Sequence, residues 1–226
     1  MDLFWSLPDS REIAGVNSSI EELFGNAQRR KFEPGASISD PEMSPERAFR
    51  CLSGTLKVTK LLASGREILI TILQTNSVWS DRAVLNGYWK DVFVEAMEPS
   101  EVCSVESAAF DRAVRSSPEL LATFMVRISE QVSDALTLLD DFRGRDVASR
   151  LARVLVKFSK QYGVPTEAGV RIELPVTHQD LANMIGTARE TVSRNMARFR
   201  QQGFVKDGHA ATLEILELSS LEALIV

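Results

Sequence analysis

The sequence predicts an α+β protein with an N-terminal antiparallel β-roll, one long central helix and a small C-terminal domain of helices and a β-hairpin. Three observations support this prediction. Short strand-like runs occur between about residues 28 and 105, apolar residues repeat in heptads after residue 117, and two short amphipathic helices precede a hairpin signal. We therefore divide the chain into a β-roll domain at 1–116, a helix and hinge at 117–145, and a C-terminal domain at 146–226.

Composition sets the broad class of the protein. The 226 residues are 44% hydrophobic and 25% charged, which suits a packed core rather than a disordered chain. No apolar run is long enough for a membrane span, the N-terminus lacks the features of a secretory signal, and two cysteines are too few for a disulfide scaffold. We therefore expect a cytoplasmic protein without a membrane partner.

Charge is unevenly distributed along the chain. The net charge of −5 argues by itself against nucleic-acid binding. However, residues 188–202 contain four arginines and one acidic residue. Any hypothesis of nucleic-acid binding depends on that short window.

Strand signals define the first domain. Residues 50–60 have β character interrupted by Gly54, residues 67–73 are rich in β-branched side chains, and shorter runs follow at 91–96 and 101–105. Several short strands at this spacing predict a small antiparallel barrel or roll. We expect residues 1–28 to be partly helical and residues 107–114 to form a short helix.

The central segment has a coiled-coil pattern. Ser117 and Pro118 provide an N-cap and a first helical residue. Apolar residues then alternate at spacings of four and three, which predicts either a helix packed on its own domain or a dimer seam, and we favour the homodimer. These dimer-helix residues are Leu121, Met125, Ile128, Val132, Ala135, Leu139 and Phe142.

A hinge separates this helix from the C-terminal domain. Gly144 lies between two arginines and interrupts the heptads, and Asp146 can cap a second helix over 147–161, which ends at Gly163. Residues 170–174 alternate in polarity and predict a strand.

The most informative segment is residues 176–203. Thr177 and Asp180 can cap a helix, Gly186 supplies a tight turn, and a second helix is expected from 188 to 202. Residues 181, 182 and 185 of the first helix and 192, 196 and 199 of the second are spaced to be buried. Two short helices joined by such a turn predict a helix-turn-helix, whose second helix enters the DNA major groove.

The exposed face of the second helix carries the candidate DNA contacts. Arginine can donate two hydrogen bonds to guanine and glutamate can accept one from cytosine. The alternative is a solvated face with a Glu190–Arg194 pair. We predict base reading by Arg189, Glu190, Ser193 and Arg194. We predict DNA-backbone contacts by Thr177, His178, Gln179, Thr191, Arg198 and Arg200.

A hairpin signal follows the second helix. Residues 204–206 and 211–216 flank an Asp-Gly turn at 207–208, and residues 219–225 suit a short closing helix. A hairpin directly after the second helix predicts a winged helix-turn-helix.

Residues 186–194, Gly-Thr-Ala-Arg-Glu-Thr-Val-Ser-Arg, resemble the recognition helix of the Crp/Fnr family of bacterial transcription regulators. The order of parts is similar as well, with a cyclic-nucleotide-type β-roll, a dimer helix, a hinge and a winged helix-turn-helix. The resemblance implies that Arg189, Glu190 and Arg194 read a G·C-containing half-site. It also implies double-stranded DNA, a second copy of the chain and RNA polymerase as partners. Residues 162–170 resemble the branch that contains the cyanobacterial global nitrogen regulators.

The same resemblance places a degenerate effector pocket in the roll, at Trp79, Ser80, Asp81, Arg82, Lys90 and Asp91. The family's phosphate cassette has glycine, glutamate, arginine and a hydroxyl where this chain has Ser80, Asp81, Lys90 and Asp91. The Asp91 carboxylate would repel a cyclic phosphate, which counts against cyclic AMP. Trp79, Tyr88 and Trp89 either fill the pocket or line a site for an apolar ligand.

Other effectors and functions have less support. Residues 1–30 lack the cysteines of an iron–sulfur centre, the roll has no histidine for haem, and the residues aligned with a 2-oxoglutarate site are Val92, Gln131 and Leu136. We therefore predict no metal and no cofactor, and we find no catalytic set for an enzyme. Cys51 and Cys103 are either buried thiols or a redox switch. The alternative function is a small-molecule or redox sensor that acts through protein contacts, with vestigial DNA binding.

Overall fold

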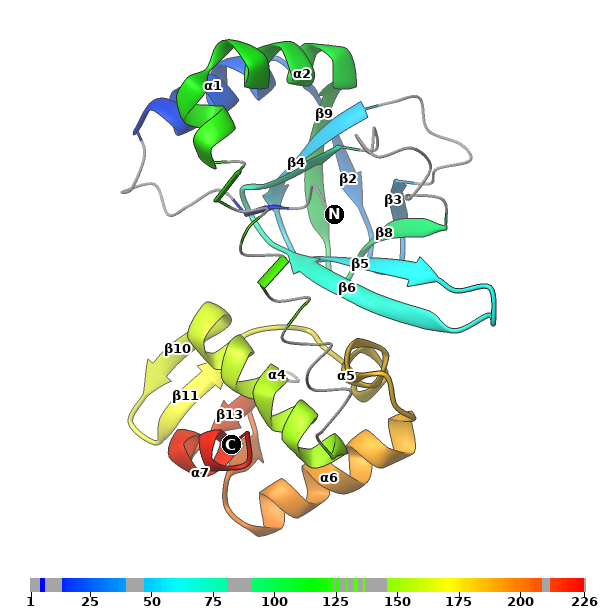
Figure 1. Ribbon diagram of the computed structural model, residues 1–226, viewed down its shortest axis with the longest axis vertical. Coiled ribbons are helices and arrows are strands. Elements are labelled where there is room, and N and C mark those ends of the chain that lie inside the picture. The colour runs from blue at the N-terminus through cyan, green and yellow to red at the C-terminus, as the bar shows by residue number, and fades with distance from the viewer. Residues whose placement is uncertain are drawn as a thin grey trace. The chain divides into compact units, whose positions relative to one another are not determined.

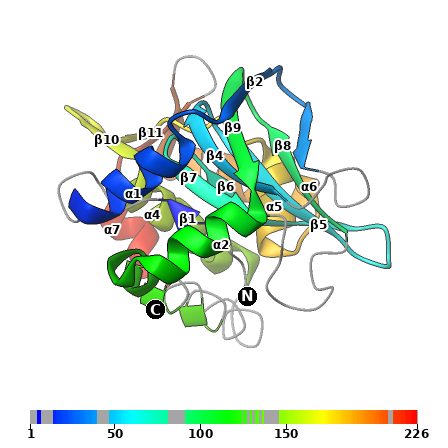
Figure 2. The same ribbon diagram turned by 90° about the horizontal axis from the view of Figure 1, so that it is seen from above.

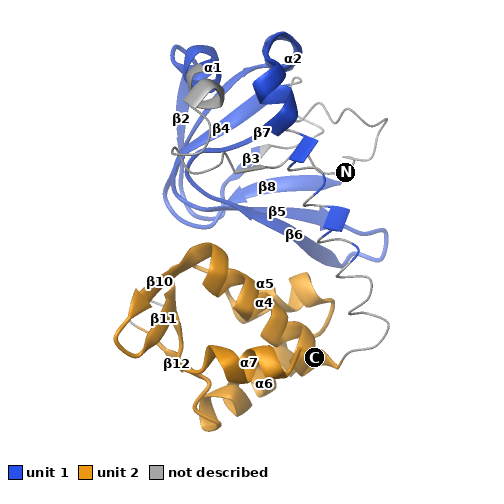
Figure 3. Cartoon of the chain, turned by 60° about the vertical axis from the view of Figure 1, so that its left-hand side comes forward, with its two compact units in different colours: residues 1–138 blue, residues 139–226 orange. Residues whose placement is uncertain are grey.

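The computed structural model (Figure 1) describes residues 5–6, 14–39, 47–80, 91–123, 125–126, 129, 132–133, 136, 146–208 and 212–225. The chain divides into two compact units, residues 1–138 and residues 139–226 (Figure 3). Each unit has its own sheets, helices and core, and we describe each by itself.

Two antiparallel sheets form the N-terminal unit. One sheet has the strand order β1-β7-β4-β9-β2 and the other has the order β3-β8-β5-β6. The bounds of the first sheet's strands are β1 Trp5–Ser6, β7 Ser77–Ser80, β4 Arg47–Ser53, β9 Ser100–Glu106 and β2 Gln28–Phe32. Those of the second are β3 Ser37–Ser39, β8 Val92–Ala96, β5 Leu56–Leu61 and β6 Glu67–Leu73. The β-roll predicted from the strand signals is confirmed.

A glycine fixes the turn between β4 and β5. Gly54 has a φ of 92°, and a Cβ atom at this position would collide with Ser100 at the start of β9. Only glycine combines a left-handed backbone with such a close approach. The interruption that Gly54 indicated in the sequence is therefore a tight turn beneath a neighbouring strand.

The main core of this unit lies between the two sheets. Phe49 and Trp79 of the first sheet stack at a centroid distance of 5.1 Å, and they share one apolar cluster with Val58 and Val94 of the second sheet. Trp79 is only 1% exposed. The core between the two sheets therefore includes the tryptophan ring of Trp79.

Helices cover the other face of the first sheet. They are α1, Ala14–Phe24, and α2, Ser107–Ser116, and Figure 2 shows them beside β9 and β4. Ile20 and Phe24 of α1 and Phe110 of α2 form a second buried cluster with Val78 and Cys103 of the sheet. Arg50 of β4 also holds α1, because its guanidinium lies 2.6 Å from the Glu21 carboxylate.

The predicted long helix begins after Ser117, and residues 118–123, 125–126, 129, 132–133 and 136 are helical. The backbone N–H of Leu120 donates to the Ser117 hydroxyl at 3.2 Å, which confirms the predicted N-cap. Leu120 is fully buried against the roll. Four of the predicted dimer-helix residues, Ile128, Ala135, Leu139 and Phe142, lie outside the residues whose side chains are described.

The described residues of the C-terminal unit, 146–208 and 212–225, form four helices and one antiparallel sheet of strand order β10-β11-β13-β12. The helices are α4 Val147–Tyr162, α5 His178–Ile185, α6 Arg189–Gln201 and α7 Leu218–Ala223. The strands are β10 Gly163–Thr166, β11 Gly169–Ile172, β12 Val205–Asp207 and β13 Leu213–Ile215. Asp146 caps α4 by accepting from Ser149 N–H at 2.8 Å, as predicted. The helix-turn-helix and the following hairpin are confirmed.

Candidate nucleic-acid interface

A capping box fixes the start of α5. The Thr177 hydroxyl accepts from the Asp180 N–H at 3.1 Å, and the Asp180 carboxylate accepts from the Thr177 N–H at 2.9 Å. The Thr177 hydroxyl also donates to that carboxylate at 2.6 Å. Two otherwise unpaired donors at the helix end are therefore satisfied, and the Thr177 hydroxyl predicted to contact DNA is already engaged in the cap.

The turn between α5 and α6 depends on Gly186. Its φ of 67° places it in the left-handed region, and its N–H donates to the Ala182 carbonyl at the end of α5. Glycine adopts this conformation without the steric cost that a Cβ atom imposes. The chain can then reverse and begin α6 within three residues.

Helix α6 has one buried face and one exposed face. Val192, Met196 and Phe199 are at most 2% exposed. Arg189, Glu190 and Arg194 are exposed near the N-terminal end of the helix, and Arg198 is exposed further along. The structure therefore brings together three of the four predicted base-reading side chains on the accessible face.

Ser193, the fourth predicted base-reading residue, has a partner inside the unit. Its hydroxyl lies 2.9 Å from Nδ1 of His178, the first residue of α5. A hydrogen bond between these two atoms joins the start of α5 to the recognition helix. The heptad-type spacing of α6 contains no signal for this contact, because it joins residues fifteen positions apart.

The remaining predicted backbone contacts divide into exposed and engaged side chains. Gln179 is exposed and donates to Asn183 at 2.7 Å, and Thr191 accepts from Arg194 at 3.3 Å. Arg200 forms an ion pair with Asp207 at 2.7 Å.

Asp207, which the sequence predicts only as a turn residue, is a further functional candidate. It ends β12, and its carboxylate accepts from both Nε and Nη2 of Arg200, at 3.0 and 2.7 Å. This two-point pairing attaches the hairpin to the end of the recognition helix. The seven-residue separation between a helical arginine and the Asp-Gly turn is the only sequence feature that could have suggested it.

A small cavity of about 80 Å³ lies inside the C-terminal unit. Most of its lining is apolar, and its polar lining includes His178, Arg200 and Asp207. This volume is too small for a metabolite of the size that drug-like ligand pockets hold. These three side chains come from α5, α6 and the hairpin, so the three elements meet at this cavity.

The predicted effector pocket of the N-terminal unit is partly described. Trp79 belongs to the core of the roll, and the Ser80 hydroxyl lies 3.2 Å from that of Ser107. Asp91 has a φ of 70°, and its carbonyl accepts from the Leu61 N–H at 2.8 Å. Asp81, Arg82 and Lys90, with Tyr88 and Trp89, lie outside the described residues. The Trp79 ring packs in the core, and the choice between a filled pocket and a site for an apolar ligand stays a prediction.

Both cysteines are buried, and they lie on opposite faces of one sheet. Cys51 belongs to the core between the sheets and Cys103 to the cluster beneath the helices. Burial raises the pKa of Cys51 to about 12 and also raises the pKa of Cys103. Protonated, inaccessible thiols are poor redox sensors, so the arrangement favours the structural reading.

No helix among the described residues is long and apolar enough to cross a membrane. In the same parts of the chain, no three His, Cys, Asp or Glu side chains lie close enough to hold a metal ion.

A helix-turn-helix with an exposed basic second helix, followed by a hairpin on a small sheet, defines a DNA-binding protein of the winged-helix class. Residues 149–224 match the Crp-like helix-turn-helix domain and residues 29–117 match the cyclic nucleotide-binding domain. The chain therefore belongs to the Crp/Fnr family of DNA-binding transcription regulators.

Relatives and solved structures agree with this assignment. The chain is 29% identical over 180 residues to a global nitrogen regulator of Synechococcus elongatus, covering 79% of this chain and 81% of that protein. It is 21% identical over 189 residues to a cAMP-activated global transcriptional regulator of Mycobacterium tuberculosis, covering 84% of each. A CooA mutant from Carboxydothermus hydrogenoformans has the same fold, with a TM-score of 0.76, 21% identity and coverage of 91% and 90%. FixK2 from Bradyrhizobium japonicum gives a TM-score of 0.73, with 17% identity and coverage of 88% and 98%.

Proposed function

We propose that this regulator acts as a homodimer that binds a near-palindromic DNA site, with one α6 helix in each of two successive major grooves. Arg189, Glu190 and Arg194 read base edges, and Gln179, Thr191 and Arg198 contact the DNA backbone. The protein works in the cytoplasm beside RNA polymerase. The observation that carries this proposal is the exposure of three base-reading side chains on a helix whose opposite face is buried.

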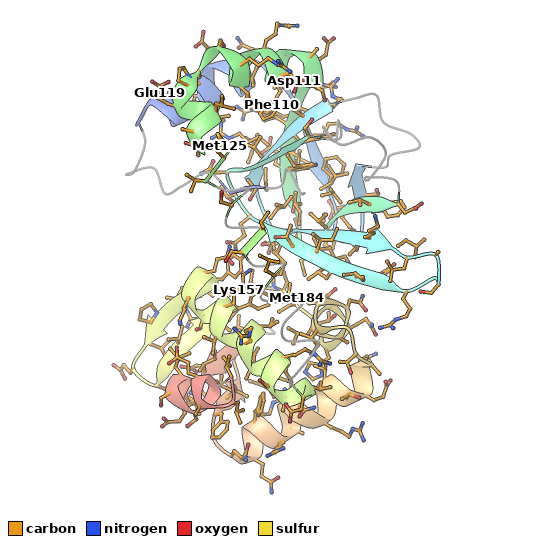
Figure 4. All side chains as sticks on the ribbon, viewed as in Figure 1. Phe110, Asp111, Glu119, Met125, Lys157 and Met184 are labelled. Atoms are coloured by element: carbon orange, nitrogen blue, oxygen red, sulfur yellow. The ribbon has the colours of Figure 1, made fainter. Side chains whose placement is uncertain are left out.

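The dimer is supported by the exposure of the heptad residues. Leu121, Met125 and Val132 are 47%, 63% and 38% exposed in the single chain. Met125 is labelled in Figure 4. Large apolar side chains that recur every three or four residues on an exposed helix face are covered when a second such helix packs against them. Two subunits related by symmetry then present two recognition helices to a palindrome.

We propose that this protein does not respond to cyclic AMP. A cyclic-nucleotide pocket requires space and hydroxyl or cationic groups for the phosphate. Here Trp79 stacks on Phe49 inside the roll, and Asp91 supplies a carboxylate where the family has a hydroxyl. Buried thiols with raised pKa values also leave a redox sensor without support.

The decisive experiment compares Arg194→Ala with Arg198→Ala. The full-length protein first selects its duplex from a random DNA pool, and affinity is then measured for that duplex and for a scrambled one. Arg194→Ala should lose affinity for the selected duplex by about 30-fold or more, because each of two half-sites loses about 1–3 kcal/mol of base recognition.

Arg198→Ala serves as the matched control, since it removes the same charge from a position assigned to a phosphate. It should weaken binding to both duplexes equally and reduce the salt dependence. If Arg194→Ala binds the selected duplex as tightly as the wild-type protein does, the base-reading assignment is wrong.

A further inference from the structure

His178 lies where the recognition helix, the preceding helix and the hairpin meet. It is the first residue of α5, and its Nδ1 atom is 2.9 Å from the Ser193 hydroxyl of α6. It lines the same small cavity as Arg200 of α6 and Asp207 of β12, which pair with each other at 2.7 Å. The imidazole is therefore held by the DNA-reading helix α6. It also lies beside the Arg200–Asp207 ion pair that joins this helix to the hairpin.

The charges around His178 come from three elements. Burial lowers the pKa of His178, Arg200 and Arg189 of α6 lower it further, and Asp207 of β12 acts in the opposite direction. Asp180, on its own helix, is occupied by the capping box with Thr177. Two cations therefore face the ring against one available anion, so burial and charge together hold the pKa of His178 below its ordinary value in the free protein.

Binding of DNA would change the net charge around the His178 imidazole from positive to negative. A duplex on α6 brings a base edge to Arg189 and phosphates to the start of α5, where the backbone N–H groups also face a negative charge. This added negative charge offsets the two arginines, and the phosphates favour a charged imidazole. A protonated ring donates from both nitrogens, so it can keep its bond to Ser193 and gain one to the DNA.

We infer that His178 takes up a proton from solvent when the protein binds DNA, so that affinity for DNA rises as the pH falls. This inference rests on the proposed function, because it concerns the same DNA-binding surface. It assigns His178 a role as a proton-coupled positioning residue that holds Ser193 in both states. It also makes the regulator's occupancy of its sites sensitive to acidification.

The direction of the pH dependence follows from the two states of the ring. The pKa of His178 is higher in the complex than in the free protein. The extra binding free energy is fully present below the free-state pKa and is lost as the pH rises through the pKa of the complex. The chain has two histidines, His178 and His209, so few side chains compete for the effect in this range.

The experiment measures the affinity of the full-length protein for its selected duplex between about pH 6 and pH 8 at constant ionic strength. For each proton taken up, the affinity should rise by up to about tenfold for every unit by which the pH is lowered. Calorimetry in buffers of different ionisation enthalpy counts the protons directly. Uptake near zero in the wild-type protein would overturn the inference.

Two variants assign the proton to its residue. His178→Gln keeps a hydrogen-bonding group beside Ser193 without a titrating charge, so its affinity should lose most of the pH dependence. His209→Gln removes the other histidine, and its affinity for DNA should keep the pH dependence. A pH dependence that survives in His178→Gln and disappears in His209→Gln would overturn the assignment to His178.

A direct measurement covers the case in which His178→Gln folds poorly. The imidazole signals of the wild-type protein are titrated by NMR with and without DNA, and His209→Gln identifies the signal of His178. The pKa of His178 should be higher with DNA, and an equal or lower value refutes the inference. A protein that binds selected and scrambled duplexes equally at every pH would instead refute the proposed function.

Discussion

In the C-terminal unit, charged side chains of α6 lie at the surface, whereas in the N-terminal unit the described residues Trp79 and Ser80 of the predicted effector pocket are buried. Arg189, Glu190 and Arg194 extend from α6 into solvent. In the roll, Trp79 is 1% exposed and Ser80 bonds to Ser107. A surface that reads DNA needs donors and acceptors that water can reach, whereas a ligand pocket needs open volume inside the fold. The comparison shows exposed charged side chains on α6 and a tryptophan ring packed inside the roll.

The largest expected effect is a loss of dimerisation and of DNA affinity, caused by a substitution in the helix that begins after Ser117. Met125→Asp places a charge in the proposed seam between two helices, and burying an unpaired charge costs several kcal/mol. We expect a monomer, with affinity for the selected duplex reduced by about 100-fold or more. Light scattering gives the mass, and fluorescence anisotropy gives the affinity.

The matched control for this variant is Val126→Asp. Val126 is 57% exposed in the single chain but lies off the heptad seam. This variant should remain dimeric and bind DNA. A dimeric Met125→Asp protein would show that the seam lies elsewhere.

The next effect tests the role of the buried tryptophan. Trp79→Ala should reduce the free energy of unfolding of the N-terminal unit by about 3–5 kcal/mol, because it removes a large buried ring and leaves a cavity. Chemical denaturation followed by circular dichroism measures the loss. Arg189→Ala, on the exposed surface, should change stability by no more than about 0.5 kcal/mol. A loss below about 1 kcal/mol in Trp79→Ala would mean that the ring contributes little to the core.

The smallest effect concerns the capping box of α5. Thr177→Ala removes the hydroxyl that accepts from the Asp180 N–H, and it should destabilise the C-terminal unit by about 1 kcal/mol. Thr177→Ser keeps the hydroxyl and should retain most of the stability. Thermal unfolding of the full-length protein compares the two, and equal losses in both variants would show that the cap contributes nothing.

Local signals predicted much of the fold. The run of β-branched residues at 67–73 corresponds to β6, the Ser117 and Asp146 caps begin helices, and the Thr177–Asp180 box with Gly186 locates the helix-turn-helix. Each of these features is encoded within a few neighbouring residues. The exposed face of α6 was predictable for the same reason, since helical periodicity alone separates it from Val192, Met196 and Phe199.

Contacts between distant residues were not predictable in this way. Strand β1 exists because Trp5–Ser6 pairs with Ser77–Val78, far along the chain. Strand β10 was not predicted because Pro165 argues against a strand, and proline is tolerated here because β10 is an edge strand of its sheet. The contacts of Ser193 with His178 and of Arg200 with Asp207 join separate elements. The DNA contacts expected of Ser193, His178 and Arg200 stay predictions, because periodicity indicates which residues are accessible and carries no information about partners elsewhere in the fold.

The position of β2 at the edge of its sheet has a consequence for biosynthesis. Its first residue, Gln28, pairs with Ser104, about 75 residues later in the chain. At a synthesis rate of roughly 5–20 residues per second, β2 is made several seconds before its partner strand exists. During that interval, Arg29, Arg30 and Lys31 keep the unpaired strand charged, which opposes pairing with the wrong chain. We therefore expect the basic residues of β2 to oppose aggregation of the newly made chain until β9 has been synthesised.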